Sequence, residues 1–271
     1  MLPPILEHAQ LKLLNGKAHT DRFKDNANRF VSGLRPELFA TRCARGIPGV
    51  GVRVPDTPIP ANLPLSMGDA IHNLRAPLDY AISEICHAAN PSKQRSNRVS
   101  FPFHKTERDL RACVKELTAK EGLPDDIGQI IINDIRPWYS SDNETSGNQA
   151  LWMLNKLDTD DKHKLLIPVV NITKVIGISG KITSAQSNIN IDKMDAEIYQ
   201  GSLMLIGCSD KDAQIHIDGF DAVEGYLLFS GLYFTLQPVL PILEHLADLV
   251  GGVLHAFQSH LQGGDLGDGA T

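Results

Sequence analysis

The chain has 271 residues, of which 42% are hydrophobic and 21% are charged, and its formal net charge is −6. This composition is typical of a globular protein with a sizeable core, and the acidic balance argues against indiscriminate binding to nucleic acid. The four cysteines are widely spaced and form no CxxC pair, which argues against a zinc ribbon or a disulfide scaffold. We therefore expect a cytoplasmic protein with neither a signal peptide nor a membrane-spanning segment, and no membrane among its partners.

The first part of the chain, residues 1–165, has the apolar spacing of helices. A first helix is expected within residues 1–34, where Gly16 would interrupt it. A proline-rich extended connection follows at 46–64, in which a short strand is allowed around residues 50–54. The clearest helix then begins behind the capping signal formed by Ser66 and Asp69, and Pro77 should kink it. Three more helices are expected, starting at Thr106, after Pro124 and after the polar turn at 140–147.

In the second part of the chain, the spacing of apolar residues changes from helical to alternating. Alternating or β-branched runs, separated by Gly, Asn, Asp and Ser, predict antiparallel strands near residues 169–178, 189–191, 203–206, 215–217 and 226–234. An amphipathic helix follows Pro238. The predicted fold class is α+β, mainly a helical bundle with an antiparallel β-sheet segment before the C-terminal helix. The expected divisions are 1–165 for the bundle, 166–235 for the β segment, 236–262 for the returning helix and 263–271 for a disordered tail.

Two polar motifs interrupt the helical, core-like sequence. The first motif, residues 68–79, reads GDAIHNLRAPLD and belongs to the second predicted helix. On a helical wheel, Arg75, Asp79 and His72 lie on one flank of its apolar face, and Asp69 and Asn73 lie further round. Arg75 and Asp79 are four residues apart and can pair within the helix.

The second motif, residues 157–164, reads LDTDDKHK and belongs to the fifth predicted helix. Asp161 falls near the middle of a stripe otherwise made of leucines, and Asp158 lies beside it. Lys162 lies near these carboxylates, whereas His163 points to the opposite side. A charge on an apolar face must find a partner or shift its pKa, so we expect the two motifs to meet in space.

One interpretation of this meeting is a structural clamp. Arg75 would pair with Asp158 or Asp161 and pin the second helix to the fifth, because a guanidinium can bind a carboxylate with two parallel hydrogen bonds. Asp161 is the carboxylate most in need of a partner, and Arg75 is the expected donor. The protein would then be a non-catalytic regulatory or host-interaction protein.

The other interpretation is a site that binds or acts on a phosphate-containing ligand such as RNA. Arg75 would hold the anionic charge and His72 would move a proton, while the aspartates would orient both. The candidate catalytic residues are His72, Arg75, Asp79, Asp158 and Asp161, and the candidate ligand-binding residues are Asp69, Asn73, Lys162 and His163. A metal site using His72, the aspartates and His87 or His104 is disfavoured because no paired-histidine spacing appears. No cofactor is expected.

The stretch 92–120 carries eight Lys and Arg residues against three acidic ones. Such a stretch either attracts an anionic ligand or RNA, or is an ordinary solvated loop and helix face. A second copy of the chain is a further partner that the sequence allows.

The two motifs together resemble a family of uncharacterised bacterial and phage-borne proteins, whose members carry GDxxHNLRxxLDH on one helix and LxxLxxxDKHR on another. This resemblance covers the whole chain and implies no established activity. A more distant resemblance is to HEPN helical domains, many of which are ribonucleases with an Arg-x(4–6)-His motif. It implies RNA cleavage centred on Arg75. Tyr80 stands where the family pattern has its histidine, so Asp79 or Tyr80 would have to replace that residue.

Overall fold

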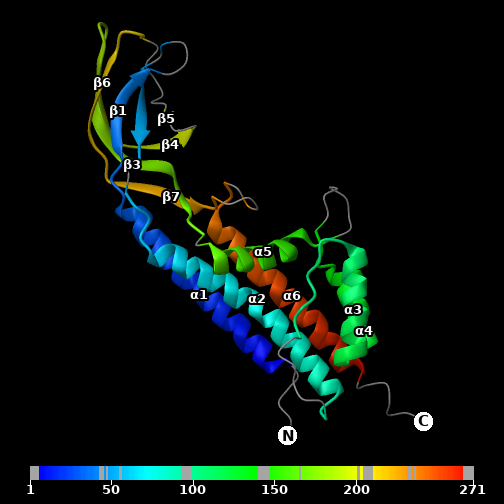
Figure 1. The fold of residues 1–271 in the computed structure, drawn as a ribbon. Helices are drawn as coiled ribbons and strands as arrows, with labels where there is room; N and C mark the ends of the chain where they lie inside the picture. The colour runs from blue at the N-terminus through cyan, green and yellow to red at the C-terminus, as the bar shows by residue number, and fades with distance from the viewer. Residues whose placement is uncertain are drawn as a thin grey trace.

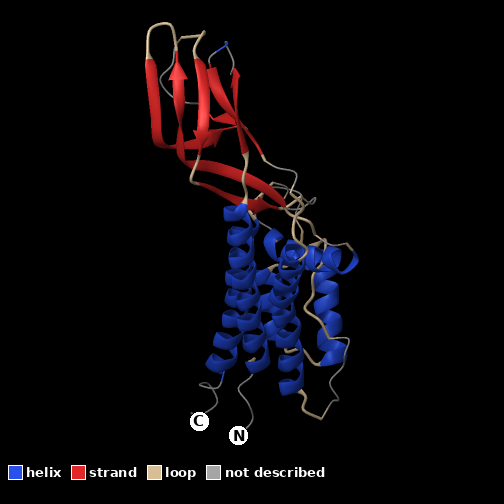
Figure 2. Cartoon of the chain, turned by 90° about the vertical axis from the view of Figure 1, so that its left-hand side faces the viewer, coloured by secondary structure: helices blue, strands red, loops and turns tan. Residues whose placement is uncertain are grey.

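The computed structural model describes residues 6–42, 46, 48–54, 57–92, 99–139, 147–164, 166–199, 202–203, 210–230, 234 and 236–264. Helices occupy one end of an elongated molecule and strands occupy the other, as Figures 1 and 2 show. The predicted α+β class is confirmed, with antiparallel pairing and a helix after the sheet. The elements are α1 (Glu7–Gly33), β1 (Glu37–Arg42), β2 (Pro48–Arg53), α2 (Asn62–Ala89), α3 (Glu107–Glu121), α4 (Asp125–Ile130), the π-helix η2 (Ile131–Ile135), α5 (Gln149–His163), β3 (Val169–Thr183), β4 (Asn188–Tyr199), β5 (Ser202–Leu203), β6 (Gln214–Gly219), β7 (Ala222–Leu228) and α6 (Val239–Gly264).

Helix α1 is unbroken at Gly16, contrary to the predicted interruption. A Cβ at this position would lie 2.8 Å from the backbone oxygen of Asn73 in α2, which is closer than real contacts allow. The glycine therefore lets the two helices approach backbone to backbone. The start of α1 is held by Glu84 of α2, a carboxylate that is only 8% exposed. It accepts the backbone N–H of His8 at 3.2 Å and of Ala9 at 3.4 Å, which satisfies donors that a helix start leaves open.

Helix α2 begins at Asn62, so the predicted capping role of Ser66 is wrong. Ser66 lies inside the helix, where its hydroxyl donates to the carbonyl oxygen of Leu63 at 3.0 Å. Pro64 occupies the first turn, where its missing N–H costs nothing because that donor has no helical acceptor. The helix continues through Pro77 to Ala89.

The other predicted helix starts are confirmed. Thr106 caps α3 by accepting the backbone N–H of Asp109 at 3.1 Å, and Asn148 caps α5 by accepting that of Leu151 at 3.1 Å. The helix after Pro124 is divided into α4 and η2 and ends at Arg136, whose φ of 53° is left-handed.

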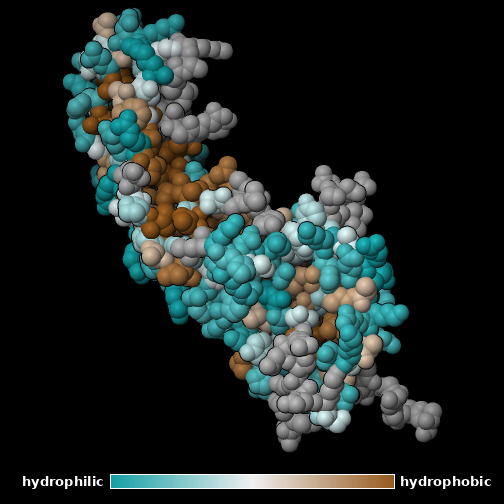
Figure 3. Space-filling model, viewed as in Figure 1, coloured by the Kyte–Doolittle hydropathy of each residue, from teal (hydrophilic) through white to brown (hydrophobic). Residues whose placement is uncertain are grey.

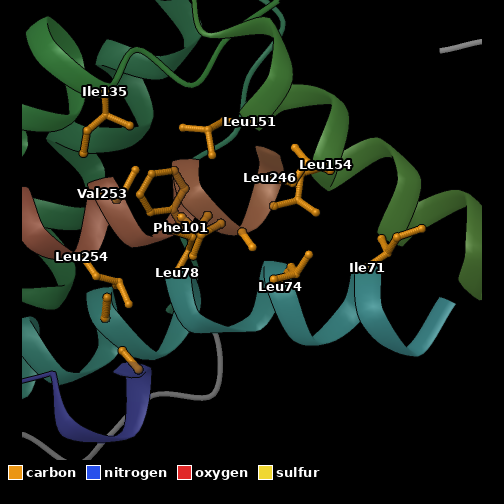
Figure 4. Packing of buried hydrophobic residues seen from close by; sticks show 14 of the residues in the cluster. Ile71, Leu74, Leu78, Phe101, Ile135, Leu151, Leu154, Leu246, Val253 and Leu254 are labelled. Atoms are coloured by element: carbon orange, nitrogen blue, oxygen red, sulfur yellow. The ribbon is translucent and has the colours of Figure 1, made fainter. Parts of the chain in front are cut away.

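The main core is formed by side chains from all of the helices, including α2, α5 and α6. Figure 4 shows Ile71, Leu74 and Leu78 of α2 directed towards Leu151 and Leu154 of α5 and Leu246 of α6. All six side chains are 0% exposed. Apolar burial of this kind is the main stabilising contribution in a globular fold, so the polar groups at its edge are placed by a rigid support.

Among the described residues the strands form one seven-stranded sheet, in the order β1-β2-β5-β4-β3-β6, with β7 also paired to β3. The sequence did not predict β1, whose residues pair antiparallel with β2, and β2 reaches the later strands through β5. The first 165 residues thus supply two strands as well as the helices. The predicted strands at 203–206 and 226–234 extend into residues outside the described ones; β5 and β7 are the described parts.

Helix α6 packs its apolar face into the bundle and reaches Gly264. Its segment Val239–Gln262 has a mean hydropathy of 1.3, and by length and composition it could cross a membrane. Core helices of globular proteins share this length and composition, so the expected absence of a membrane-spanning segment stays a prediction. The predicted tail included Gly263 and Gly264, which belong to α6, and residues 265–271 lie outside the described ones.

Candidate functional site at the junction of helices α2 and α5

Asp158 is the centre of the junction. Its side chain comes from α5 and is only 4% exposed. The Nδ1 atom of His72 lies 2.8 Å from its Oδ1, and the Nζ atom of Lys162 lies 2.7 Å from its Oδ2. The Nε atom of Arg75 lies 3.9 Å from Oδ2. A buried carboxylate is tolerable only when cations or donors surround it, and this one has three such neighbours.

Arg75 is 12% exposed and is held on several sides. Its Nη1 pairs with Asp79 within α2, and its Nε donates to the side-chain oxygen of Asn155 in α5 at 3.2 Å. Its guanidinium carbon lies 5.2 Å from the ring centre of Phe103. Burial lowers the pKa of Arg75, and the charge of Asp158 opposes this change. The guanidinium of Arg75 therefore contacts a carboxylate, a side-chain amide and an aromatic ring of the protein.

Asp79 extends the junction to the segment before α3. Its Oδ2 pairs with Arg75, and its Oδ1 accepts the backbone N–H of Phe101 at 2.8 Å. Phe101 is 2% exposed and stacks at a tilt against Phe103, with 4.9 Å between the ring centres. Asp79 therefore ties the Arg75 side chain to the loop that covers it.

Asp161 does not pair with Arg75, so that prediction was wrong. Its carboxylate instead lies over Gly68 of α2, where a Cβ would come within 2.3 Å of Oδ2. Its Oδ1 is buried and has no hydrogen-bond partner among the described residues. Burial raises the pKa of Asp161, and the negative charges of Asp158 and Asp69 raise it further. A hydrogen bond from the backbone of Leu166 and the nearby His72 both lower it.

A group whose pKa is higher in the folded than in the unfolded chain favours folding when it is protonated. The stabilisation is complete below the unfolded pKa and is lost as the pH rises through the folded one. We therefore expect Asp161→Asn to raise the melting temperature, with a gain that grows from acid to neutral pH. Thermal unfolding measured over this range, with Asp25→Asn on the exposed side of α1 as the control, tests the expectation. A gain of the same size at every pH would contradict it.

His72 is the member of the cluster that meets solvent, since its side chain is 53% exposed. Its Nδ1 is directed at the buried carboxylate of Asp158, which in a neutral ring places the proton on Nδ1 and leaves Nε2 as an acceptor. Lys162, 55% exposed, holds the other oxygen of the same carboxylate. The exposed edge of the junction is therefore a histidine and a lysine in front of one aspartate.

The remaining predicted residues surround this edge without joining it. Asp69 is 62% exposed, and its Oδ2 lies 3.9 Å from Nδ1 of His19 in α1. Asn73 donates to the backbone oxygen of Asp69 and accepts from Asn15, each at 2.8 Å. His163 is exposed at the end of α5.

Three residues of the junction were missed from the sequence. Asn155 precedes Asp158 by three positions, so it lies on the same helical face, and this spacing could have identified it. Gly68 and Phe103 give no comparable signal, because their roles depend on what another segment brings next to them.

The electrostatics of the junction do not favour an anion. The two motifs contain five aspartates, Asp69, Asp79, Asp158, Asp160 and Asp161, against three fixed cations, Arg75, Lys162 and Lys164. In the described part of the basic stretch, three of the five cations pair with acids on α3 itself: Arg108 with Asp109, Arg111 with Glu107 and Lys120 with Glu116. Helix α3 packs against α4 and η2 rather than at this edge. Within the described part of the stretch, acids of α3 thus offset three of the five cations.

Several hollows lined by described residues lie away from the junction. Two of them, of about 320 and 330 Å³, flank α1, and another of about 390 Å³ lies beside α6. Among the described residues, no group of three or more His, Cys, Asp and Glu side chains is arranged to hold a metal ion. The chemistry available at the junction is therefore acid–base chemistry at His72 and the pairing of charges.

Comparison with known proteins gives no relative from which to transfer a role. No family model matches the chain, and neither a curated protein nor a solved structure is significantly similar to it. The resemblances noted from the two motifs stay predictions.

Proposed function

We propose that this chain is a non-catalytic interaction protein of the cytoplasm, in which the two motifs form a clamp between α2 and α5. The observation that supports the proposal is that the buried charges of the junction are directed at one another. Asp158 faces His72, Lys162 and Arg75, and Arg75 also faces Asp79 and Asn155. An arginine held in this way is not available to hold a ligand's phosphate.

The clamp lies where the helical bundle meets the segment leading to β3, because α5 ends at His163 and β3 begins at Val169. Fixing α5 on α2 therefore fixes the start of the longest strand. In this account the bundle is the rigid support, and the sheet at the other end of the molecule (Figure 2) is the part presented to a partner.

A second candidate is an acid–base site that binds or acts on a phosphate-containing ligand such as RNA. One observation favours it: a buried aspartate orients a half-exposed histidine, and a lysine lies beside them. This pairing is the arrangement that sets the tautomer of a catalytic histidine. The excess of carboxylates around it weighs against an anionic ligand.

Turnover of phosphodiesters separates the two candidates. We expect the wild type to hydrolyse neither bis(p-nitrophenyl) phosphate nor a short single-stranded RNA faster than His72→Gln does, because Arg75 and Lys162 are both paired with aspartates of the junction. We also expect no saturable binding of the RNA by fluorescence anisotropy. Turnover or RNA binding that His72→Gln and Lys162→Gln both abolish, while circular dichroism shows an intact fold, would establish the second candidate instead.

A further inference from the structure

The ladder between β3 and β7 is apolar on both of its faces where it approaches the helices. On the inner face, Val170 pairs with Leu227, and Ile172 follows two residues along β3. Leu227 is 3% exposed and Ile172 is 5% exposed, so this face is covered by the protein's own cores. Strands that are apolar on both faces are normally buried on both.

The outer face of this ladder is open. Val169 pairs with Leu228 and Asn171 pairs with Tyr226, so these side chains lie on the face opposite to Val170 and Leu227. Val169 is 38% exposed and Tyr226 is 40% exposed, and Ile167, two residues before Val169, is 55% exposed. We call Ile167, Val169, Leu228 and Tyr226 the outer apolar face. Figure 3 shows apolar surface gathered on the sheet end of the molecule, next to the helices.

Charge is distributed unevenly around the outer apolar face. His163 and Lys164 are exposed and precede Ile167 by only a few residues, while Glu224 lies two residues beyond Tyr226 on the β7 side. From residue 167 to residue 171 a strand advances roughly 13 Å, which is four steps of about 3.3 Å. The face is therefore short and mainly apolar, with Asn171 among its side chains, and His163 and Lys164 lie near the end closest to α5. A stable interface between two copies needs about 800 Å² from each partner, which is more than so short a face offers.

We propose that the outer apolar face binds a short peptide segment of a partner protein, with apolar side chains in its middle and carboxylates at the end that meets His163 and Lys164. The inference deepens the proposed interaction role and rests on it. The apolar side chains of the peptide would cover Val169 and Tyr226. The strand pair would then be buried on both of its apolar faces. The carboxylates would supply the charge that selects its orientation.

The test uses the full chain and fluorescein-labelled peptides in which alternating leucine and phenylalanine residues are followed by glutamates. Fluorescence anisotropy measures binding to the wild type, to the double variant Val169→Thr with Tyr226→Thr, and to Lys164→Glu. Threonine is β-branched and favours strands, so the fold should be retained at both positions. Leu11→Gln is the control, because Leu11 is an exposed apolar residue (57%) on α1, outside the outer apolar face.

We expect saturable binding that the double variant weakens at least about tenfold, or 1.4 kcal/mol. Lys164→Glu should weaken it too and should favour an otherwise identical peptide with lysines in place of the glutamates. Leu11→Gln should bind as the wild type does. Binding by the wild type should also weaken as salt is added.

Four outcomes would overturn the proposal. The peptides do not bind saturably, or the double variant binds them as well as the wild type does. Vesicles of anionic lipid bind the wild type and not the double variant, which would make the face a membrane contact. Light scattering shows a dimer that the double variant loses, which would assign the face to a second copy. None of these results alters the phosphodiester test, so the docking proposal and the non-catalytic role can fail separately.

Discussion

Replacing Arg75 by alanine should lower the free energy of unfolding by about 3–5 kcal/mol, the usual cost of removing one partner of a buried ion pair. The substitution removes the guanidinium from Asp158 and Asp79 and takes away the hydrogen bond to Asn155. It also removes the contact with the ring of Phe103. His72 and Lys162 still face Asp158, so the effect is a strong destabilisation of a folded chain.

Thermal unfolding followed by circular dichroism measures this effect, and a loss of this size lowers the melting temperature by roughly 6–20 °C. Arg111→Ala is the control, since Arg111 pairs with Glu107 along α3 and its side chain is 50% exposed. Exposed pairs of this kind contribute about 0.3–0.5 kcal/mol. Equal changes in the two variants would show that Arg75 has no special role.

Replacing Gly68 by alanine should destabilise the protein by about 1–3 kcal/mol, the usual cost of overpacking a filled site. The new methyl group would come within 2.3 Å of Oδ2 of Asp161 and 2.6 Å of its Cγ. Alanine is the better helix former by about 1 kcal/mol, so destabilisation here would reveal the contact between the helices rather than a local preference.

Two comparison variants isolate the cause. Gly252→Ala lies in α6, where nothing stands within 4 Å of the new methyl group, and should stabilise the protein by about 0.5–1 kcal/mol. Asp161→Ala removes the carboxylate that Gly68→Ala would meet. Combined with it, Gly68→Ala should behave like Gly252→Ala. A gain in stability from Gly68→Ala in the wild-type background would mean that α5 does not lie against Gly68.

The meeting of α2 and α5 could be predicted because both motifs place charges beside apolar stripes, and such charges need partners. Which carboxylate faces Arg75 could not be predicted, because it depends on how far one helix slides along the other. Asp158 and Asp161 are three residues apart, or about 4.5 Å along the axis. A wheel drawn for one helix holds no information on that distance, nor on the glycine that makes room for Asp161.

In the sheet, too, contacts between distant segments could not be predicted from the sequence. The strands after Pro168 were predicted from their own alternation, whereas β1 is a single short run whose pairing partner is β2. The two-faced ladder of β3 and β7 likewise depends on register between segments about 50 residues apart. The period of the apolar residues identifies helices and strands that bury one face. The pairing and register of strands depend on contacts between distant segments.

The most direct measurement of the clamp is a double-mutant cycle between Arg75→Ala and Asp158→Asn, with unfolding free energies taken from urea titrations of the wild type, both single variants and the double variant. If the two side chains stabilise the same junction, the double variant should lose less than the sum of the single losses, by about 0.5–3 kcal/mol. Losses that add to within about 0.3–0.5 kcal/mol would show that Arg75 and Asp158 act independently, and would contradict the clamp.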